Sequence, residues 1–198
     1  MIITIVDYDA GNIKSIGNML EYLGIKYKIS SKKEDILSSD GVIFPGQGHF
    51  RQAMENLETK GLTDTIKQYI ETKRPFLGIC LGLQILFERS EEACDINGLG
   101  IIKGKVKKFK SGKIPQIGWN KIVIEKGNNS YLTDDYFYFV NSYYVDPDNK
   151  SIISSRAFYH QEFCASIEKN NITAVQFHPE KSAQAGVKFF QKWVDKII

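Results

Sequence analysis

The chain has 198 residues, of which 42% are hydrophobic and 25% are charged, and these values are ordinary for a globular protein with a substantial core. Its formal net charge of +3 lacks the strong basic bias of a dedicated nucleic-acid-binding protein. No apolar run approaches the ~18 residues of a membrane-spanning helix, and the first residues do not read as a secretory signal. We therefore expect a cytoplasmic protein that binds neither nucleic acid nor membrane.

The first half of the chain alternates short apolar runs with helical patterns. Strands are predicted at residues 2–8, 27–30, 41–44 and 75–79, and helices at 52–72 and 81–89. Between the first two strands, Ile13, Ile16, Leu20 and Leu23 recur at helical spacing. This alternation predicts an α/β fold with a doubly wound, mainly parallel sheet.

From about residue 98 the pattern changes to a run of strands, predicted at residues 101–109, 122–125, 136–144 and 173–177. A closing helix is predicted from the apolar positions Val187, Phe190, Trp193, Val194 and Ile197, which share one helical face. We therefore expect a β-rich second half. Because no repeat or linker interrupts the pattern, a single domain over residues 1–198 is predicted.

Three cysteines and three histidines show neither a paired framework nor metal-ligand spacing, so no disulfide scaffold, metal site or cofactor is predicted. A lysine cluster between Lys103 and Lys113 could attract phosphates or an acidic partner. We favour a strand with Val106 inward and the lysines in water, because aromatic side chains that would stack on bases are nearly absent there.

Cys80 lies in the stretch GICLG, where a predicted buried strand turns sharply into a predicted helix. A nucleophile elbow has no room for side chains two positions before and after the nucleophile, and both of these positions are glycine. A helix N-terminus favours the thiolate of Cys80, and the N–H of Leu81 would point to the oxygen of an attacked carbonyl. From this motif alone, Cys80 could equally be a small buried side chain.

A His-Pro-Glu sequence follows the strand predicted at residues 173–177. Pro179 restricts the backbone beside His178, and Glu180 can orient the imidazole and stabilise its charge. His178 would take the thiol proton and return it to the leaving group. Alone, the tripeptide could be a surface turn, but together with Cys80 it indicates a catalytic triad.

A glycine-rich loop, PGQG at residues 45–48, follows another predicted strand. Its backbone N–H groups could approach a ligand, as an oxyanion hole requires. Without Cys80 and His178, an ordinary strand-to-helix loop would explain it. His49 follows this loop and could line a pocket, whereas His160, Cys94 and Cys164 have no comparable context.

These motifs together resemble the class I, triad-type glutamine amidotransferases, and their flanking segments are similar to the glutaminase subunits of imidazole glycerol phosphate synthase. The resemblance runs from end to end and is carried by DYDAGNIKS (7–15), PGQGHF (45–50), GICLGLQILFE (78–88), IGWN (117–120), YFVNSYYV (138–145) and QFHPEKS (176–182). It implies a flavodoxin-like fold and release of ammonia from glutamine. It also implies a (β/α)₈-barrel cyclase partner that forms imidazole glycerol phosphate and aminoimidazole carboxamide ribonucleotide in histidine biosynthesis.

The resemblance also implies roles for individual residues. Cys80 would be the nucleophile, His178 the base and acid, and Glu180 the residue that orients it. The other implied sets are Gln47, Gly48 and Leu81 for the oxyanion hole, Gln84, Ser142 and Tyr143 for glutamine binding, and Asn12, Trp119, Asn120, Tyr138 and Lys181 for the partner interface. Trp119 and Tyr138 could alternatively be core aromatics, and Lys181 a solvated lysine.

The chain departs from the family pattern at Gln116 and Asn141, where histidine is common, and at Gln47, where valine is usual. These positions lie near the pocket or the partner side, so they bear on which acceptor receives the ammonia. Two alternatives remain: a related subunit that supplies ammonia for acetamidino-sugar biosynthesis, and a stand-alone thiol hydrolase.

Overall fold

In the computed structural model, which describes residues 1–125 and 132–197, the chain folds around a mixed β-sheet. At one end of the sheet the strands are parallel, in the order β2-β1-β3-β4-β13. These strands are β1 (Ile3–Val6), β2 (Tyr27–Ser30), β3 (Gly41–Phe44), β4 (Phe76–Ile79) and β13 (Ile172–Val175). The helices around them are α1 (Ile13–Tyr22), α2 (Lys33–Ser38), α3 (Phe50–Thr59), α4 (Leu62–Glu71) and α6 (Ala183–Val194).

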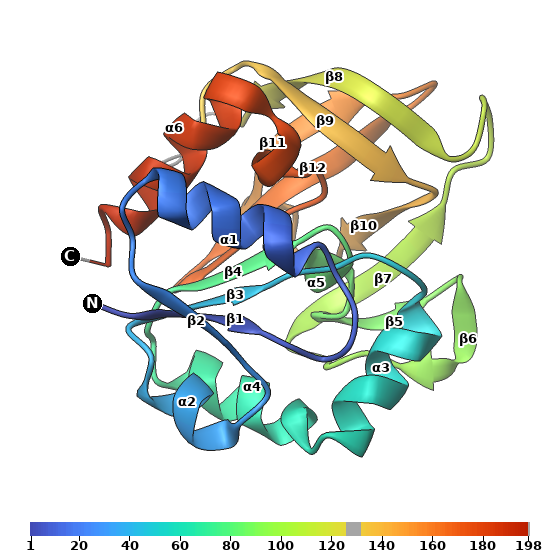
Figure 1. Cartoon of the computed structure of the whole chain (residues 1–198). Coiled ribbons are helices and arrows are strands. Elements are labelled where there is room, and N and C mark those ends of the chain that lie inside the picture. The colour runs from blue at the N-terminus through green and yellow to red at the C-terminus, as the bar shows by residue number, and fades with distance from the viewer. Residues whose placement is uncertain (126–131, 198) are drawn as a thin grey trace.

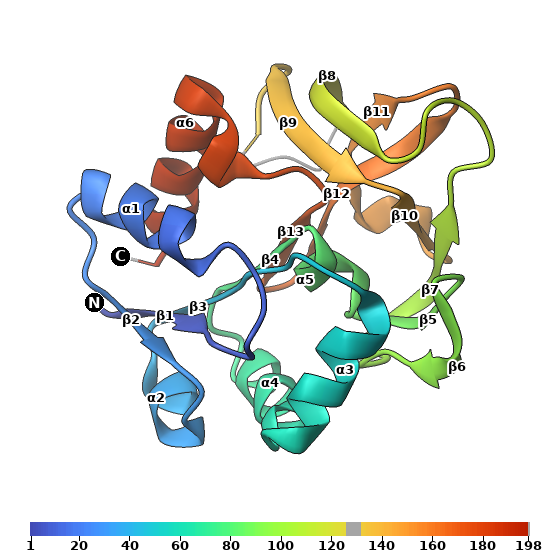
Figure 2. The same cartoon turned by 45° about the vertical axis from the view of Figure 1, so that its right-hand side comes forward.

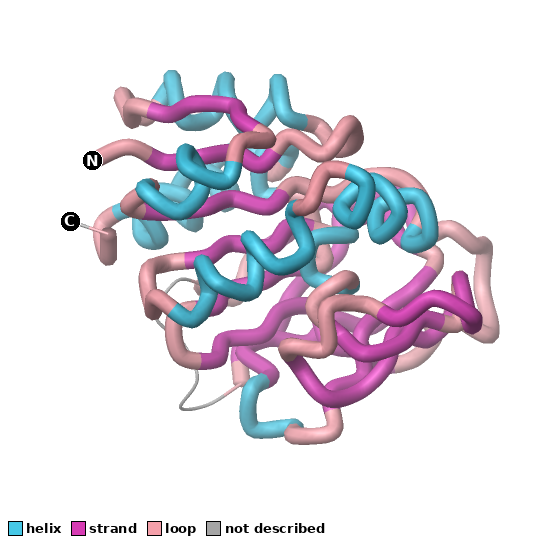
Figure 3. Tube along the Cα trace, turned by 90° about the horizontal axis from the view of Figure 1, so that it is seen from below, coloured by secondary structure: helices cyan, strands magenta, loops and turns pink. Residues whose placement is uncertain are grey.

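Strand β3 shows why this parallel half is covered on both faces. Val42 and Phe44 pack in the same cluster as residues of α3 and α4, whereas Ile43 packs with residues of α1 and α6. Successive strand residues point to opposite faces, and burying each such side chain contributes about 1.5–3 kcal/mol. Figure 1 shows α1 and α6 above the sheet and α2, α3 and α4 below it, and Figure 3 shows the strands side by side. The predicted doubly wound α/β fold is confirmed.

The other end of the sheet is mainly antiparallel and continues from β13 through β12, β10, β7, β5 and β6. These strands are β5 (Phe87–Ser90), β6 (Ala93–Asn97), β7 (Ile102–Lys108), β10 (Tyr143–Pro147) and β12 (Glu162–Lys169). A branch leaves β12 through β11 (Ile153–Phe158), β8 (Gln116–Ile124) and β9 (Tyr136–Asn141). Figure 2 shows β8 and β9 on the side of α6, away from α2, α3 and α4. The predicted β-rich second half is confirmed.

Two predicted helices are wrong in extent. The helix predicted at residues 52–72 is divided into α3 and α4 by Gly61, which adopts a left-handed conformation with φ 65°. The helix predicted at residues 81–89 ends early, as α5 (Leu81–Gln84). The backbone carbonyls of residues 85–87 accept hydrogen bonds from N–H groups of residues 99–102. Tertiary pairing therefore uses the acceptors that a longer helix would need.

The strand predicted at residues 136–144 is two strands, β9 and β10, separated at Ser142. They separate because β9 pairs with β8, whereas β10 pairs with β7 and β12. The strand predicted at residues 122–125 is the end of the longer β8, and the sequence analysis missed α2, β5, β6, β11 and β12. The change of partner at Ser142 places this turn beside the site described below.

Most of the lysine cluster lies on β7, as expected, and Lys110 and Lys113 follow this strand. Val106 is fully buried there, and Lys103 and Lys105 are exposed. The side chain of Lys107 pairs with Asp146 on β10. The interpretation as an ordinary strand with solvated lysines is confirmed.

The carboxyl ends of β1, β3, β4 and β13 meet at one edge of the sheet, because these strands are parallel. Ligand sites of open α/β sheets lie at this edge. The edge carries the loop 45–49 after β3, Cys80 after β4, and residues 176–180 after β13. Within residues 1–125 and 132–197, no helix is long and apolar enough to cross a membrane.

Candidate active site

Cys80 occupies a strained turn between β4 and α5. Its φ of 53° and ψ of −105° form a combination that L-residues rarely adopt, and its N–H donates to the carbonyl of Val175 at 2.7 Å. A Cβ at Gly78 would lie 2.7 Å from the carbonyl oxygen of Gly82, and a Cβ at Gly82 would lie 2.3 Å from that of Phe44. The sharp turn therefore requires both glycines, for the steric reason that the sequence analysis gave.

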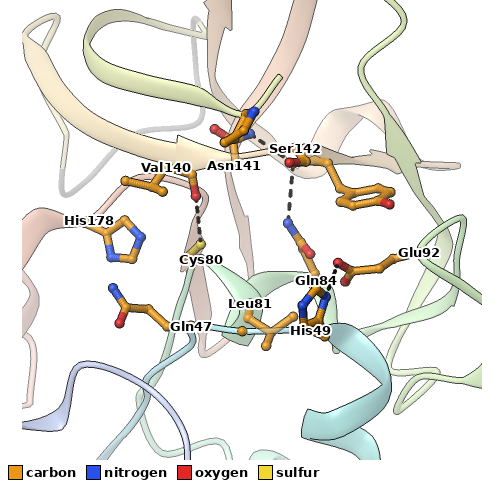
Figure 4. A pocket seen from close by; sticks show the side chains of 13 residues that line it. Gln47, His49, Cys80, Leu81, Gln84, Glu92, Val140, Asn141, Ser142 and His178 are labelled. Carbon is orange, nitrogen blue, oxygen red and sulfur yellow. Dashed lines mark hydrogen bonds and ion pairs between the residues drawn. The ribbon is translucent and has the colours of Figure 1, made fainter. Parts of the chain in front are cut away.

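His178 is held by its backbone and by a carboxylate. Its N–H donates to the carbonyl of Tyr138 at 2.8 Å, and its own carbonyl accepts from the hydroxyl of Ser182 at 2.7 Å. The buried imidazole donates from Nδ1 to Oε1 of Glu180 at 2.8 Å, and the Glu180 side chain is buried as well. This bond leaves Nε2 of the ring for Cys80, which lies beside it (Figure 4).

The charge of His178 depends on these two neighbours. Burial by itself would lower the pKa of His178, because it penalises the charged ring. The charge and hydrogen bond of Cys80, followed by those of Glu180, outweigh burial and raise the pKa of His178 to about 10. The site therefore favours a charged imidazolium directly beside the sulfur of Cys80. A positive charge in this position favours the thiolate, which is the reactive form of cysteine.

Cys80 and His178 open into a cavity of about 370 Å³ (Figure 4). Most side chains that the sequence analysis associated with the nucleophile line this cavity: Gln47, Gly48, Cys80, Leu81, Gln84, Ser142, Tyr143 and His178. They come from four separate segments of the chain. Glu180 does not line the cavity, because it lies behind the imidazole that it holds.

The loop after β3 packs on the first turn of α5. A Cβ at Gly46 would lie 2.4 Å from the backbone nitrogen of Gly82 and 2.5 Å from Cβ of Leu81, whereas Gly48 is open and has a φ of 108°. Leu81 is the first residue of α5, and such an N–H has no acceptor within its own helix. The loop and the start of α5 thus form one wall of the cavity beside Cys80.

The sequence analysis missed Glu92, Pro115 and Val140 as cavity residues, and it placed His49 and Asn141 there only as possibilities. Glu92 accepts from the backbone N–H of Phe50 at 2.8 Å and lies 3.2 Å from Nδ1 of His49. Glu92 lies in the turn between β5 and β6, in a region that the sequence analysis assigned no strands. No local pattern around Glu92 could have brought it to the site.

Two of the three departures from the family pattern contact one another. Gln116 and Asn141 are buried and paired across β8 and β9, and Nε2 of Gln116 lies 3.4 Å from Oδ1 of Asn141. Asn141 also donates to the carbonyl of Tyr143 at 2.9 Å. These amides therefore support the turn that carries Ser142 and Tyr143, and Gln47 lies on the opposite wall of the cavity (Figure 4).

One face of the β8–β9–β11 branch carries exposed apolar side chains, with Lys121 and Arg156 between them. The apolar side chains, which we call the exposed β8 face, are Ile117, Trp119, Val123, Tyr136, Tyr138 and Phe158. All except Tyr138 are more than half exposed, and the rings of Trp119 and Tyr138 are 6.0 Å apart. Val140 pairs with Ile117 and also lines the cavity. An exposed apolar patch of this kind marks an interaction site, and here it reaches the mouth of the cavity.

The other predicted interface residues lie apart from the exposed β8 face. Asn120 bonds to Gln116 and to the carbonyl of Phe158, so it supports the branch. Asn12 precedes α1, and Lys181 is exposed on the short helix Pro179–Lys181, against which α1 packs. Because more than half of its surface is exposed, Trp119 is not a core aromatic.

The remaining thiols and histidine lie elsewhere. Burial raises the pKa of Cys164 to about 12, so it stays protonated near neutral pH, and Cys94 is exposed. His160 packs against Gly112 and Tyr159 and does not line the cavity. Among the described residues, no group of three His, Cys, Asp or Glu side chains could hold a metal ion.

The family model described as "Glutamine amidotransferase class-I" matches residues 4–196. The chain therefore belongs to the class I glutamine amidotransferases. A solved glutamine amidotransferase structure has a TM-score of 0.79 over 98% of both chains at 17% identity, and PurLQS from Thermotoga maritima has a TM-score of 0.77 at the same identity. These two structural similarities show the fold alone.

Curated relatives define the family within this class. The chain is 47% identical to imidazole glycerol phosphate synthase subunit HisH of Methanocaldococcus jannaschii, over 98% of both chains, and 45% identical to HisH of Trichodesmium erythraeum, over 99% and 95%. It is also 44% identical to the chloroplastic imidazole glycerol phosphate synthase hisHF of Arabidopsis thaliana, but spans only 34% of that protein. The chain belongs to the HisH family.

Proposed function

We propose that the cavity binds glutamine and that Cys80, His178 and Glu180 hydrolyse its side-chain amide. The observation that carries this proposal is the buried carboxylate–imidazole–thiol arrangement at the carboxyl edge of the sheet, in a chain of the HisH family. In the proposed reaction the thiolate attacks the amide carbon, and the C–N bond breaks as His178 protonates the leaving nitrogen. Ammonia departs and leaves a γ-glutamyl thioester on Cys80.

The second half of the reaction uses the same groups in reverse. His178, now neutral, takes a proton from water as the water attacks the thioester carbon. The C–S bond breaks, glutamate leaves, and the ion pair of thiolate and imidazolium is restored. Glu180 holds the imidazole through Nδ1 in both steps, so the ring turns neither toward solvent nor away from the sulfur.

The oxyanion of each tetrahedral intermediate needs donors beside Cys80. The N–H of Leu81 and the backbone of Gln47 and Gly48 lie in the walls next to the sulfur, and we assign this role to them. A well-placed donor of this type contributes about 2.7–4 kcal/mol in the transition state. The glycine-rich loop can supply one without a side chain in the way.

Gln84, Ser142 and Tyr143, which line the cavity, would hold the substrate. Glu92 adds a carboxylate to this lining, with a side chain only 16% exposed. A partly buried carboxylate favours the α-ammonium group of an amino acid over a neutral ligand. Glu92→Gln should therefore raise KM for glutamine more than it lowers kcat.

Ammonia released here must be used elsewhere, and we propose a (β/α)₈-barrel cyclase as the consumer. It would dock on the exposed β8 face together with Asn12 and Lys181. There it would combine ammonia with a ribonucleotide substrate of its own, which is cleaved to give imidazole glycerol phosphate and aminoimidazole carboxamide ribonucleotide in histidine biosynthesis. The Arabidopsis relative named hisHF supports a fused counterpart of such a pair. Docking beside Val140 would enclose the cavity mouth and keep ammonia unprotonated. We further propose a single cytoplasmic domain over residues 1–198.

A growth experiment tests this acceptor. The chain is supplied, with the cyclase of its own organism, to cells that lack a glutaminase subunit of their own. Growth without histidine is the expected result, and the Cys80→Ala variant serves as the control that should not grow. No growth with either protein, combined with loss of a surface-sugar amidine when this chain is deleted from its own cell, would assign the ammonia to acetamidino-sugar synthesis. That second acceptor is considered because Gln116 and Asn141 replace family histidines beside the cavity.

A further inference from the structure

Gln176 is a glutamine buried immediately beside the nucleophile. Its side chain is fully shielded from solvent, and its backbone N–H donates to the carbonyl of Ala165 on β12 at 2.8 Å. The residue lies between β13 and His178, so its backbone is fixed by the same strand that positions the imidazole. Neither the cavity lining nor the proposed reaction steps include it.

The side-chain amide of Gln176 connects two residues of the site. Its Nε2 donates to Sγ of Cys80 at 3.5 Å, and its Oε1 accepts from Nε2 of Gln84 at 3.0 Å. Nε2 of Gln84 also lies 3.4 Å from the carbonyl oxygen of Tyr143. If the Gln176 amide were turned around, its NH2 group would meet the NH2 group of Gln84, and no hydrogen bond could form between them. Gln84 therefore determines that the NH2 end of Gln176 points to the sulfur.

The sulfur of Cys80 makes two contacts. As a thiol it can donate to the carbonyl of Val140, 3.9 Å away, and it accepts the N–H of Gln176. The thiolate has no proton for Val140, so it keeps only the contact with Gln176. A donor directed at the charged form stabilises that form relative to the neutral one. Gln176 thus adds a neutral donor to the positive charge that His178 supplies.

The other ionisable groups around Cys80 do not replace this donor. Glu180 is occupied with His178. Tyr8, which follows β1, donates its hydroxyl to the carbonyl of Pro45, and burial together with the charge of Cys80 raises its pKa far above neutrality. The groups that face the sulfur from β13 and the segment after it are therefore His178 and Gln176.

We propose that Gln176 is a positioning residue of the glutaminase reaction: it stabilises the Cys80 thiolate and fixes the orientation of Gln84 toward the substrate. This inference rests on the proposed role of Cys80 as the nucleophile. Gln176 transfers no proton and forms no bond to glutamine. It acts through the sulfur at one end of its amide and through Gln84 at the other.

The test compares Gln176→Met, which keeps the volume and removes both amide groups, with Thr173→Val, a buried isosteric change on the same β13 strand. Glutamate release is measured with the cyclase partner, and alkylation of Cys80 by iodoacetamide is followed by peptide mass spectrometry across pH. For Gln176→Met we expect kcat/KM to fall roughly ten- to hundred-fold, and the midpoint of the alkylation curve to rise by roughly one pH unit. Thr173→Val should change neither.

Gln176→Glu keeps the shape and the oxygen that faces Gln84, but places a carboxyl group against the sulfur. It should lose more activity than Gln176→Met and shift the alkylation midpoint further, and it carries the test if Gln176→Met does not fold. In a double-mutant cycle, Gln84→Met should cost less activity in the Gln176→Met background than in the parent.

Unchanged kcat/KM and an unchanged alkylation midpoint in the folded Gln176 variants would overturn this inference and leave the proposed function intact. A loss of activity with an unshifted alkylation midpoint would also overturn it, because a merely structural effect would have that signature. Failure of the proposed function would give a different result, because the Cys80→Ala variant would then release glutamate at the parental rate.

Discussion

The parallel half of the sheet and the β8–β9–β11 branch differ in how far their apolar side chains are buried. The parallel strands are covered by helices on both faces, and Ile43 and Phe44 are completely buried. The branch leaves Trp119 and Phe158 in solvent. Groups at the ends of fully packed strands are held rigidly, as chemistry requires. An open apolar sheet face is suited to binding another protein.

The two regions meet at the candidate active site. Cys80 and His178 follow the ends of β4 and β13, whereas Val140, Ser142 and Tyr143 come from the end of β9, the turn after it and the start of β10. The backbone N–H of His178 donates to Tyr138, so the catalytic segment is bonded directly to the branch that carries the exposed face. Changes in the parallel half should therefore affect chemistry, and changes on the exposed β8 face should affect association.

The largest effect is expected from Cys80→Ala. This variant should reduce glutamate release by about 10⁴-fold or more, because it removes the atom that forms the thioester. The variant should still fold, since alanine is smaller and fits the same turn. Glutamate release with the partner present, together with urea denaturation, measures both. Retained turnover would place the nucleophile outside the parallel half.

His178→Ala should be almost as damaging as Cys80→Ala, whereas Glu180→Gln should retain measurable activity. The imidazole transfers the proton, but the carboxylate only orients the ring and stabilises its charge. Comparing kcat/KM of the two variants at one pH tests this order. Parental activity of His178→Ala would move the base elsewhere, with His49 as the next histidine at the cavity.

The raised pKa of His178 predicts a pH dependence of stability. The ring titrates at about 6.5 when unfolded and at about 10 in the folded protein. Between these values the folded state binds more protons, so the free energy of unfolding should fall as pH rises through this window. Denaturation at several pH values measures the slope. His178→Asn should flatten it, and an equal slope in both proteins would contradict the coupling of His178 to its buried neighbours.

Trp119→Ala should weaken binding of the cyclase about tenfold or more, as truncation of a central interface aromatic does. The rate of Cys80 alkylation should not change, because Trp119 lies outside the cavity. Titration calorimetry with the barrel subunit measures the affinity, and Tyr22→Ala on α1 is a control for losing an exposed aromatic elsewhere. Equal affinities for all three proteins would show that the partner docks on another surface.

The sequence located the residues of the candidate site better than it predicted the architecture of the second half. The elbow around Cys80 and the His178–Glu180 pair depend on local sequence, because each motif constrains its own backbone. Strands β11 and β12 were missed because buried Ser154, Ser155 and Ser166 interrupt their apolar pattern. These serines satisfy one another by hydrogen bonds that only the fold brings together.

Two further features depended on long-range contacts. The helix predicted at residues 81–89 stops at Gln84, because long-range hydrogen bonds to residues 99–102 and pairing with β7 make Phe87–Ser90 the strand β5. Glu92 reaches the cavity only because that pairing brings the β5–β6 turn next to Phe50. The exposed β8 face was identified at Trp119 and Tyr138 by resemblance, and its full extent required the register of β8 with β9 and β11.

The most direct test of the central claim is to label the protein with a diazoketone analogue of glutamine and map the modified peptide. Three thiols are available for comparison: Cys80 in the cavity, Cys94 at the surface and Cys164 in the core. The account predicts one covalent adduct, on Cys80 alone, that excess glutamine prevents and that His178→Ala slows. An adduct on Cys94 or Cys164, or a protein that releases glutamate while Cys80 stays unlabelled, would contradict it.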